Sequence, residues 1–351
     1  MVSACRLALL IHWSIQMKAI VYSQNLPATD PQSLYDTELP TPTPGDHDLL
    51  VAVQAVSVNP VDTKIRRNAD TQGQLRVLGW DAAGIVVAVG SAVTGFKAGD
   101  EVWYAGAIDK PGSNSEFQLV DQRIASHKPK SLSFSEAAAL PLTAITAWEL
   151  LFDRLELNEH NSKGKSLLVI GAAGGVGSVL LQLARQKTQL KVIGTASRPE
   201  TSEWVRTLGA DLVLDHKKPM AAQLKTLGLP EVDYVISLTH TDHHFNDIIE
   251  LIKPQGKLAL IDDPEPIDVR QLKRKSLSLH WELMFTRSLY QTEDMSAQQQ
   301  LLQQVADMVD AGQLKTTLNA DFGTINAENL RKAHQLIESQ QAIGKLVLTG
   351  F

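Results

Sequence analysis

Hydrophobic and polar positions in the first third of the chain alternate in short runs. The clearest run is DLLVAVQAVSV at residues 48–58, and a second lies at residues 84–89. Alternation over this length, broken by proline and glycine, is typical of strands. Residues 40–45 (PTPTPG) cannot form a central strand, because proline has no N–H to donate to a ladder. Residues 18–120 are therefore predicted to form a β-rich, barrel-like domain.

The pattern changes to helical spacing between residues 133 and 152, where Ser133 or Ser135 can cap a helix before Glu136. From residue 166 onward, short apolar runs alternate with amphipathic segments. This alternation predicts βαβ units and hence a parallel, doubly wound sheet with helices on both faces. Residues 277–284 (LSLHWELM) would add one more strand, and residues 298–310 a helix that ends at Gly312.

The last apolar run, residues 345–348, is again barrel-like, so the C-terminus is expected to complete the first domain. A length of 351 residues also favours two cores over one. The expected division is residues 17–140 for the barrel, 141–288 for the doubly wound domain and 289–351 for the rest of the barrel domain. Residues 1–16 are expected to be an extension, because Met17 opens the strand-like run MKAIVY.

Composition and charge narrow the possible partners. A net charge of -6 gives no basic surplus for a nucleic acid, and the apolar run at residues 7–13 is too short to cross a bilayer. Cys5 is the only cysteine, which excludes an intrachain disulfide and a cysteine-built zinc cluster. These features predict a cytoplasmic protein that binds neither nucleic acid nor membrane.

The most informative motif is GAAGGVG at residues 171–177, which follows the apolar run LLVI and precedes a helical segment. Glycine lets the backbone approach a pyrophosphate, and the helix N-terminus offers free N–H groups and a positive dipole end. Between a strand and a helix, this loop predicts a dinucleotide site. The expected cofactor contacts are Gly171, Ala173, Gly174, Gly175, Val176 and Gly177.

The next strand is predicted to end at TASR, residues 195–198, where an NAD site usually has an acidic residue. No acid occurs before Glu200. Ser197 and Arg198 suit a 2′-phosphate by hydroxyl and charge, which favours NADP(H) over NAD(H). The alternative is that Arg198 lies in solvent and contacts no cofactor.

Several ordered motifs resemble the medium-chain dehydrogenase/reductase superfamily, in particular its zinc-free quinone oxidoreductase-like branch and the zinc-type alcohol dehydrogenase-like group. They are VNPVD (58–62), GWDAAG (79–84), GDEV (99–102), LPLTA (140–144), the glycine loop, TLGAD (207–211) and GK (344–345). The resemblance implies an α/β protein with a GroES-like β-barrel domain, a Rossmann NADP-binding domain and a cleft between them.

The same resemblance indicates that the zinc ligands are missing. Zinc enzymes of the superfamily bind the metal with cysteine and a His-Glu pair, but this chain has Asn59 and Trp80-Asp81 at those positions. No metal is therefore expected. The implied reaction is metal-free hydride transfer from NADPH to a quinone or an α,β-unsaturated carbonyl. The alternatives are a zinc-dependent alcohol dehydrogenase and a non-catalytic NADPH-binding sensor.

The resemblance also suggests roles for individual residues. Asn59 and Trp80 would face the substrate, although Asn59 is also an ordinary turn residue before Pro60. Lys64 stands where related quinone reductases often have a tyrosine, so Lys64 and Asn59 are the catalytic candidates. The remaining expected cofactor contacts are Thr143, His216, Leu238, Thr239 and Lys345.

Two further expectations concern metal binding and assembly. The imidazoles of residues 240–244 (HTDHH) are interpreted as part of a loop near the cofactor, since a metal would need a further ligand and supporting contacts. The apolar strand at residues 277–284 is expected to pair with its copy in a homodimer.

Overall fold

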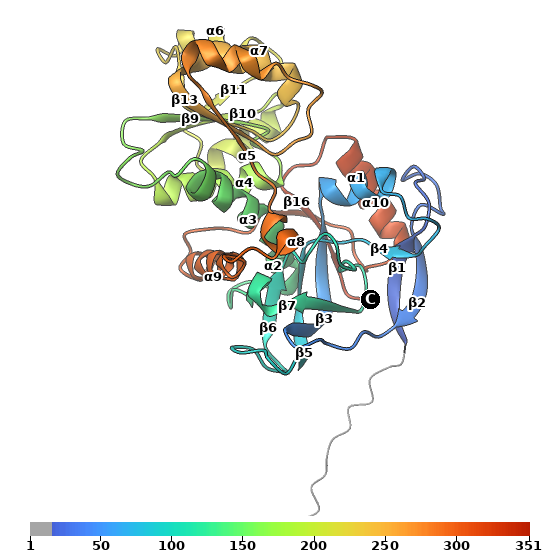
Figure 1. The fold of residues 1–351 in the computed structure, drawn as a ribbon. Coiled ribbons are helices and arrows are strands. Elements are labelled where there is room, and N and C mark those ends of the chain that lie inside the picture. Colours follow the sequence, from blue (N-terminus) through green and yellow to red (C-terminus); the bar gives the residue numbers. More distant parts are fainter. Residues whose placement is uncertain (1–15) are drawn as a thin grey trace, which may run out of the picture.

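The computed structural model describes residues 16–351, which form two domains joined side by side (Figure 1). The expected extension at residues 1–16 lies, except for Gln16, outside the described residues. The predicted fold class is confirmed, because a barrel domain of mainly antiparallel strands and a parallel doubly wound domain are both present. No helix among residues 16–351 is long and apolar enough to cross a membrane.

The barrel domain is organised around β3, which begins at Asp48 and ends at Val58 as predicted. β3 pairs antiparallel with β5, β7 and β16, so the C-terminal strand lies in the barrel sheet. A small second sheet has the order β2-β1-β4. The bounds are β1 Gln16–Tyr22, β2 Tyr35–Pro40, β4 Arg76–Val77, β5 Ala82–Val89, β6 Glu101–Tyr104, β7 Phe117–Asp121, β8 Ala125–His127, β15 Leu318–Asp321 and β16 Lys345–Thr349.

The doubly wound domain is a six-stranded sheet with the order β11-β10-β9-β12-β13-β14, and all its neighbouring strands are parallel. The strand order reverses between β9 and β12, where ligands of open α/β sheets bind. The strands are β9 Ser166–Ile170, β10 Lys191–Thr195, β11 Leu212–Leu214, β12 Val232–Ser237, β13 Ile252–Leu260 and β14 Ser278–Trp281.

The helical run predicted between residues 133 and 152 is divided in three. Ser133 caps the first helix, because its Oγ accepts a hydrogen bond from the Glu136 N–H at 3.3 Å. Helix α2 ends at Ala138 and α3 begins at Pro141, whose ring cannot continue a preceding helix. A π-helical turn, Glu149–Arg154, then follows α3 directly.

The helix bounds are α1 Pro60–Asn68, α2 Phe134–Ala138, α3 Pro141–Trp148, α4 Gly175–Lys187, α5 Pro199–Thr207, α6 Met220–Thr226, α7 Thr241–Leu251, α8 Thr286–Tyr290, α9 Ala297–Asp310 and α10 Ala327–Glu338, with 3₁₀ turns at Gln122–Ile124 and Val269–Lys275.

Two apolar cores cover the two faces of the parallel sheet. The larger is continuous from the barrel interior through α3, α4 and α9 to one sheet face. The smaller lies under α6 and α7 on the opposite face. Because the barrel and one face of the doubly wound sheet share a core, the junction between the domains is packed where the glycine loop lies.

Candidate active site

The glycine loop connects β9 to α4. Gly171 has a φ of +81°, which glycine adopts without strain. Its N–H donates to Thr195 Oγ1 at 3.1 Å, which joins the loop to the end of β10. A Cβ at Gly171 would lie 3.0 Å from Thr239 Cγ2 and 3.4 Å from Leu238 Cβ, so both predicted cofactor residues adjoin the loop.

Two further glycines allow close packing at the start of α4. A Cβ at Gly177 would lie 2.5 Å from the Ala172 carbonyl oxygen, so a larger residue would push the helix from the strand. A Cβ at Gly175 would lie 2.8 Å from Lys345 Cδ and 3.0 Å from Thr143 Cγ2. Thr143 and Lys345, distant in sequence, therefore both lie against the first residue of α4.

This region fits the pyrophosphate of a dinucleotide. The first N–H groups of a helix have no intrahelical acceptor, and they point toward the loop that precedes the helix. Here that loop follows the first strand of a doubly wound sheet, beside the reversal of strand order. Residues 171–177 would hold the phosphates, with Thr143, Leu238 and Thr239 around them.

At the expected adenosine end, Ser197 and Arg198 follow β10. Arg198 is not free: its Nε lies 3.1 Å from Glu200 Oε1, and its Nη2 donates to the Gln341 carbonyl at 3.1 Å. Both contacts are partly exposed to solvent, and exposed ion pairs stabilise weakly. A 2′-phosphate would therefore compete with Glu200 for the guanidinium.

His216 follows β11 and lies near α7, with its ring centroid 6.3 Å from that of His244. Burial lowers the pKa of both imidazoles, and neighbouring histidines lower that of His244 further. His240 precedes α7 in a left-handed conformation, with Nδ1 2.8 Å from Thr239 Oγ1. Among residues 16–351, no three His, Cys, Asp or Glu side chains are grouped to hold a metal ion.

A buried polar cluster, formed by Asn59, Asp81 and Lys345, lies at the junction of the domains. The Lys345 ammonium donates to Asp81 Oδ2 at 2.9 Å, to the Val58 carbonyl at 3.2 Å and to Asn59 Oδ1. Asn59 Nδ2 in turn donates to Asp81 Oδ2 at 3.1 Å. The three side chains are at most 3 % exposed. We call these three residues the junction cluster.

Further donors complete the coordination of the Asp81 carboxylate. Ser57 Oγ donates to Oδ2 at 2.9 Å, and the Leu142 N–H at the start of α3 donates to Oδ1 at 2.9 Å. A buried carboxylate is tolerated only when it is paired and hydrogen-bonded, and Asp81 satisfies both conditions. The carboxylate joins β5, β3, α3 and β16 at one point.

Asp62 lies beside the junction cluster, in the first turn of α1. Its Oδ2 accepts the Asn59 N–H at 2.7 Å and so caps the helix. Burial raises the pKa of Asp62 to about 7; the Asn59 hydrogen bond and the Lys345 charge oppose this rise, and the Asp81 charge adds to it. Asp62 is therefore a carboxyl group that can hold a proton at neutral pH.

Lys64 and Trp80 occupy different surroundings. Lys64 Nζ lies 2.7 Å from Asp263 Oδ2, and this exposed pair connects α1 to the segment after β13 across the two domains. Trp80 is buried: its Nε1 donates to the Ala107 carbonyl at 3.1 Å, and its ring meets Phe285 edge-on at 6.2 Å. The catalytic role of Lys64 and the substrate contact of Trp80 stay predictions.

The junction cluster does not fit a catalytic zinc ion. Zinc needs three lone-pair donors and an open position. At the positions implied by the resemblance, Trp80 offers no such donor, and the Asn59 and Asp81 oxygens are bound by the Lys345 ammonium.

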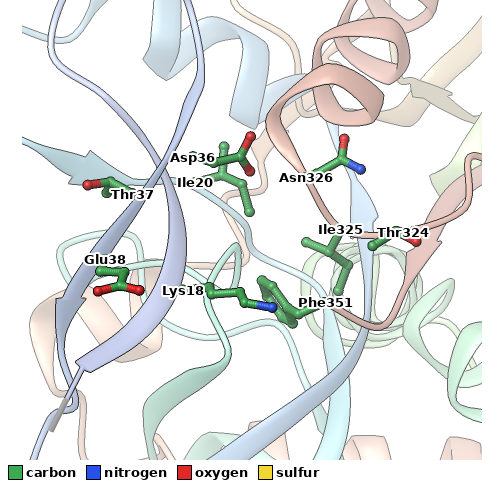
Figure 2. A pocket seen from close by; sticks show the side chains of 9 residues that line it. All are labelled: Lys18, Ile20, Asp36, Thr37, Glu38, Thr324, Ile325, Asn326 and Phe351. Carbon is green, nitrogen blue, oxygen red and sulfur yellow. The ribbon is translucent and has the colours of Figure 1, made fainter. Parts of the chain in front are cut away.

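Thr143, Leu238, Thr239 and Lys345, all predicted cofactor contacts, lie next to the glycine loop. The sequence named Asp81 only at a zinc-ligand position, without its contacts to Asn59 and Lys345, and it did not point to Asp263. The available signal for Asp81 was a charged residue inside the otherwise apolar run GWDAAG. A separate depression of about 380 Å³ lies between β1, β2 and the start of α10, and it contains none of the predicted site residues (Figure 2).

Comparisons with known proteins identify the family to which the two domains belong. Residues 45–130 match the alcohol dehydrogenase GroES-like domain, and residues 208–348 match the zinc-binding dehydrogenase family. A zinc-type alcohol dehydrogenase-like protein of Staphylococcus aureus is 44% identical over 310 residues, which cover 88% of this chain and 92% of that protein.

Solved structures show the same architecture. A Rhizobium etli protein described as a candidate zinc-dependent alcohol dehydrogenase is 54% identical, with a TM-score of 0.93 over 97% of this chain and 99% of that one. The quinone oxidoreductase of Coxiella burnetii is 27% identical, with a TM-score of 0.78 over 95% of this chain and 99% of that one. The chain therefore belongs to the medium-chain dehydrogenase/reductase superfamily of oxidoreductases, as the sequence motifs predicted.

Proposed function

We propose that this protein reduces a quinone or an α,β-unsaturated carbonyl compound with NADPH and without a metal ion. The observation that carries the proposal is the junction cluster. The Lys345 ammonium group binds Asn59 and Asp81, which stand at positions that the resemblance assigns to the metal ligands of zinc enzymes. An activated acceptor needs less help than an alcohol, because hydride adds directly to an electron-poor carbon.

The glycine loop and α4 would hold the cofactor phosphates, and Ser197 and Arg198 would receive the 2′-phosphate. When bound, the dinucleotide would supply a hydride, that is, two electrons and one proton. The acceptor carbon forms the new C–H bond, and the π electrons of the acceptor move to its oxygen. A proton then completes the product. Lys64, whose ammonium pairs with Asp263 across the two domains, is the proposed donor of that proton.

The test is steady-state oxidation of NADPH and NADH against quinones, enones and aldehydes. We expect turnover with NADPH and the first two classes, and no change after chelation. Activity that disappears with a chelator and returns with zinc would favour an alcohol dehydrogenase. Tight cofactor binding without oxidation by any acceptor would favour a sensor.

A substitution at Arg198 tests the preference for NADPH over NADH. Arg198→Ala should weaken NADPH binding about tenfold or more, because one charge-assisted contact to phosphate is lost, and should leave NADH binding within about twofold. Arg185→Ala, which removes the exposed partner of Asp211, is the matched control. Equal loss for both cofactors would contradict the assignment.

We also propose a homodimer formed through the edge strand β14. Trp281 and Leu283 at this edge are 52% and 51% exposed, so two large apolar side chains lie together on an unpaired sheet edge. Pairing of two such edges would bury them and continue the sheet. Analytical ultracentrifugation should give a dimer that Leu283→Lys dissociates; a wild-type monomer would contradict this proposal.

A further inference from the structure

The junction cluster contains two charges, the Asp81 carboxylate and the Lys345 ammonium, and Lys345 is the first residue of the C-terminal strand β16. Its three ammonium hydrogens match three acceptors: the Val58 carbonyl, Asn59 Oδ1 and Asp81 Oδ2. An ammonium group has three donors and no acceptor, so its hydrogen-bonding capacity is filled. Lys345 is therefore fixed in the barrel and is not directed at the glycine loop.

The stem of Lys345 nevertheless lies on that loop. Its Cδ would be 2.8 Å from a Cβ at Gly175, and the preceding Gly344 donates its N–H to the Ala173 carbonyl at 3.0 Å. The same side chain thus covers the first residue of α4 with its methylenes and reaches Asn59 and Asp81 with its charge. The loop and the junction cluster are connected through one residue.

Asn59 is oriented by these contacts. Its Oδ1 accepts a hydrogen bond from Lys345, and its Nδ2 donates one to Asp81 Oδ2, so the amide cannot flip without losing both hydrogen bonds. The backbone N–H of Asn59 is bound by Asp62 Oδ2 at 2.7 Å. Removal of the ammonium would release the amide and leave the Asp81 carboxylate without its counter-ion.

We propose that Lys345 is a positioning residue: its buried ammonium, neutralised by Asp81, holds the Asn59 amide and the Asp81 carboxylate in one fixed orientation at the junction of the domains. This inference rests on the proposed function and specifies its substrate class. Polar groups held in a fixed orientation favour an acceptor whose oxygen becomes negative as hydride arrives, that is, a conjugated carbonyl compound. The electron pair stays on that oxygen until it is protonated.

The first experiment compares Lys345→Met with wild type for turnover and for NADPH binding. We expect kcat with a quinone or enone to fall about a hundredfold, the effect typical of a lost preorganised electrostatic group. NADPH affinity should change less than about threefold, because the ammonium does not point to the phosphate loop. Lys332→Met, which removes an exposed lysine paired with Glu328, is the matched control. Wild-type kcat in Lys345→Met, or NADPH affinity lost in proportion to kcat, would overturn the proposal.

A second variant covers the case in which Lys345→Met does not fold. Lys345→Met combined with Asp81→Asn removes both buried charges and should restore folding without restoring turnover. Wild-type turnover in this double variant would also overturn the proposal.

A second measurement does not depend on turnover. The titration of Asp62 can be followed by carboxyl carbon NMR, and the groups acting on it are Lys345, Asp81 and the N–H groups of Asn59 and Gly79. Loss of the cation in Lys345→Met should move the midpoint to higher pH, and loss of the anion in Asp81→Asn should move it to lower pH. A merely packing role would not give shifts of opposite sign, so midpoints that stay in place would overturn the proposal. If wild type reduces no acceptor, the proposed function fails, while the titration still decides where the Lys345 charge acts.

Discussion

The two ends of α1 bury polar groups in different ways. At its start, the side-chain polar atoms of Asn59, Asp81 and Lys345 are matched by hydrogen bonds, and the exception beside them is Asp62 Oδ1. Near its end, Arg66 is fully buried against α10, and only its Nη2 has a partner, the Glu338 carboxylate. Arg66 Nε and Nη1 and both His334 ring nitrogens have no protein partner within residues 16–351.

This difference shows which buried charge organises its surroundings. A fully bonded network fixes each member and is disrupted when one is removed. A buried donor without a partner costs about 1–3 kcal/mol unless water reaches it. The junction cluster should therefore be sensitive to substitution, whereas the α1–α10 contact should tolerate replacement of Arg66.

The largest effect on stability is expected for Lys345→Met. The variant leaves the buried Asp81 carboxylate without its counter-ion, which typically costs about 3–5 kcal/mol. Urea unfolding at neutral pH measures the loss. Lys345→Met with Asp81→Asn should recover most of it, and a double variant no more stable than the single one would contradict the expected coupling.

Asp62→Asn should change how stability depends on pH. Because the pKa of Asp62 is raised to about 7, the folded protein binds a proton between about pH 4 and 7 that the unfolded chain has released. This group therefore makes the fold less stable as pH rises through that window, by about 1.4 kcal/mol per pH unit. Asp62→Asn should remove the decline, so from pH 5 to pH 7.5 its free energy of unfolding should gain about 2.5 kcal/mol relative to wild type. Asp263→Asn, at an exposed site, should follow wild type.

His334 should give a pH dependence of the opposite sign. Burial, and secondly the charge of Arg66, lower the pKa of His334 to about 3. Below about pH 6.5 the unfolded chain binds a proton that the folded protein does not, so stability should fall as the solution is acidified. From pH 7 to pH 5 this contribution is about 2 kcal/mol. His334→Gln should lack it, as urea unfolding at both values would show. A parallel loss in the variant would exclude His334 as the cause, and the exposed His160→Gln is the control.

The smallest effect is expected for Arg66→Met. Methionine removes two unpartnered nitrogens and keeps the packing of the long side chain, while Glu338, which is 23% exposed, can turn to water. The free energy of unfolding should change by less than about 1 kcal/mol. Glu338→Gln keeps the buried guanidinium but removes its anionic partner, and it should be the more damaging change. The reverse order would show that the α1–α10 contact is as tightly organised as the junction cluster.

Local patterns were enough to predict much of the fold. The alternation over residues 48–58 predicted the bounds of β3. The apolar run before the glycine loop predicted β9, and the helical segment after the loop predicted α4. These elements follow from side-chain periodicity within one segment. The division of α2 from α3 was missed, because the helical spacing of apolar residues hid the effect of Pro141.

The candidate site was only partly predictable, because its decisive contacts are distant in sequence. Lys345 and Asn59 are separated by 286 positions, and Lys64 and Asp263 by 199. The sequence indicated that Lys345 adjoins the cofactor region, but not that its charge is held by Asn59 and Asp81. It likewise indicated a role for Arg198 without showing that Glu200 competes for it. The Lys345 contacts depend on how distant strands of the barrel meet, and the Lys64–Asp263 pair depends on how the two domains meet; no local pattern encodes either.

The bond from Gly344 to Ala173 has a mechanical consequence. It fixes the barrel to the doubly wound domain at the carboxyl end of β9, next to the buried Lys345. Asp263 follows β13, two strands away in the order β9-β12-β13, or about 10 Å at the usual strand spacing. If the domains move apart, the exposed Lys64–Asp263 pair should separate before the Gly344–Ala173 contact, because exposed ion pairs stabilise weakly. Thermal motion can therefore break the Lys64–Asp263 ion pair while the Gly344–Ala173 hydrogen bond stays intact.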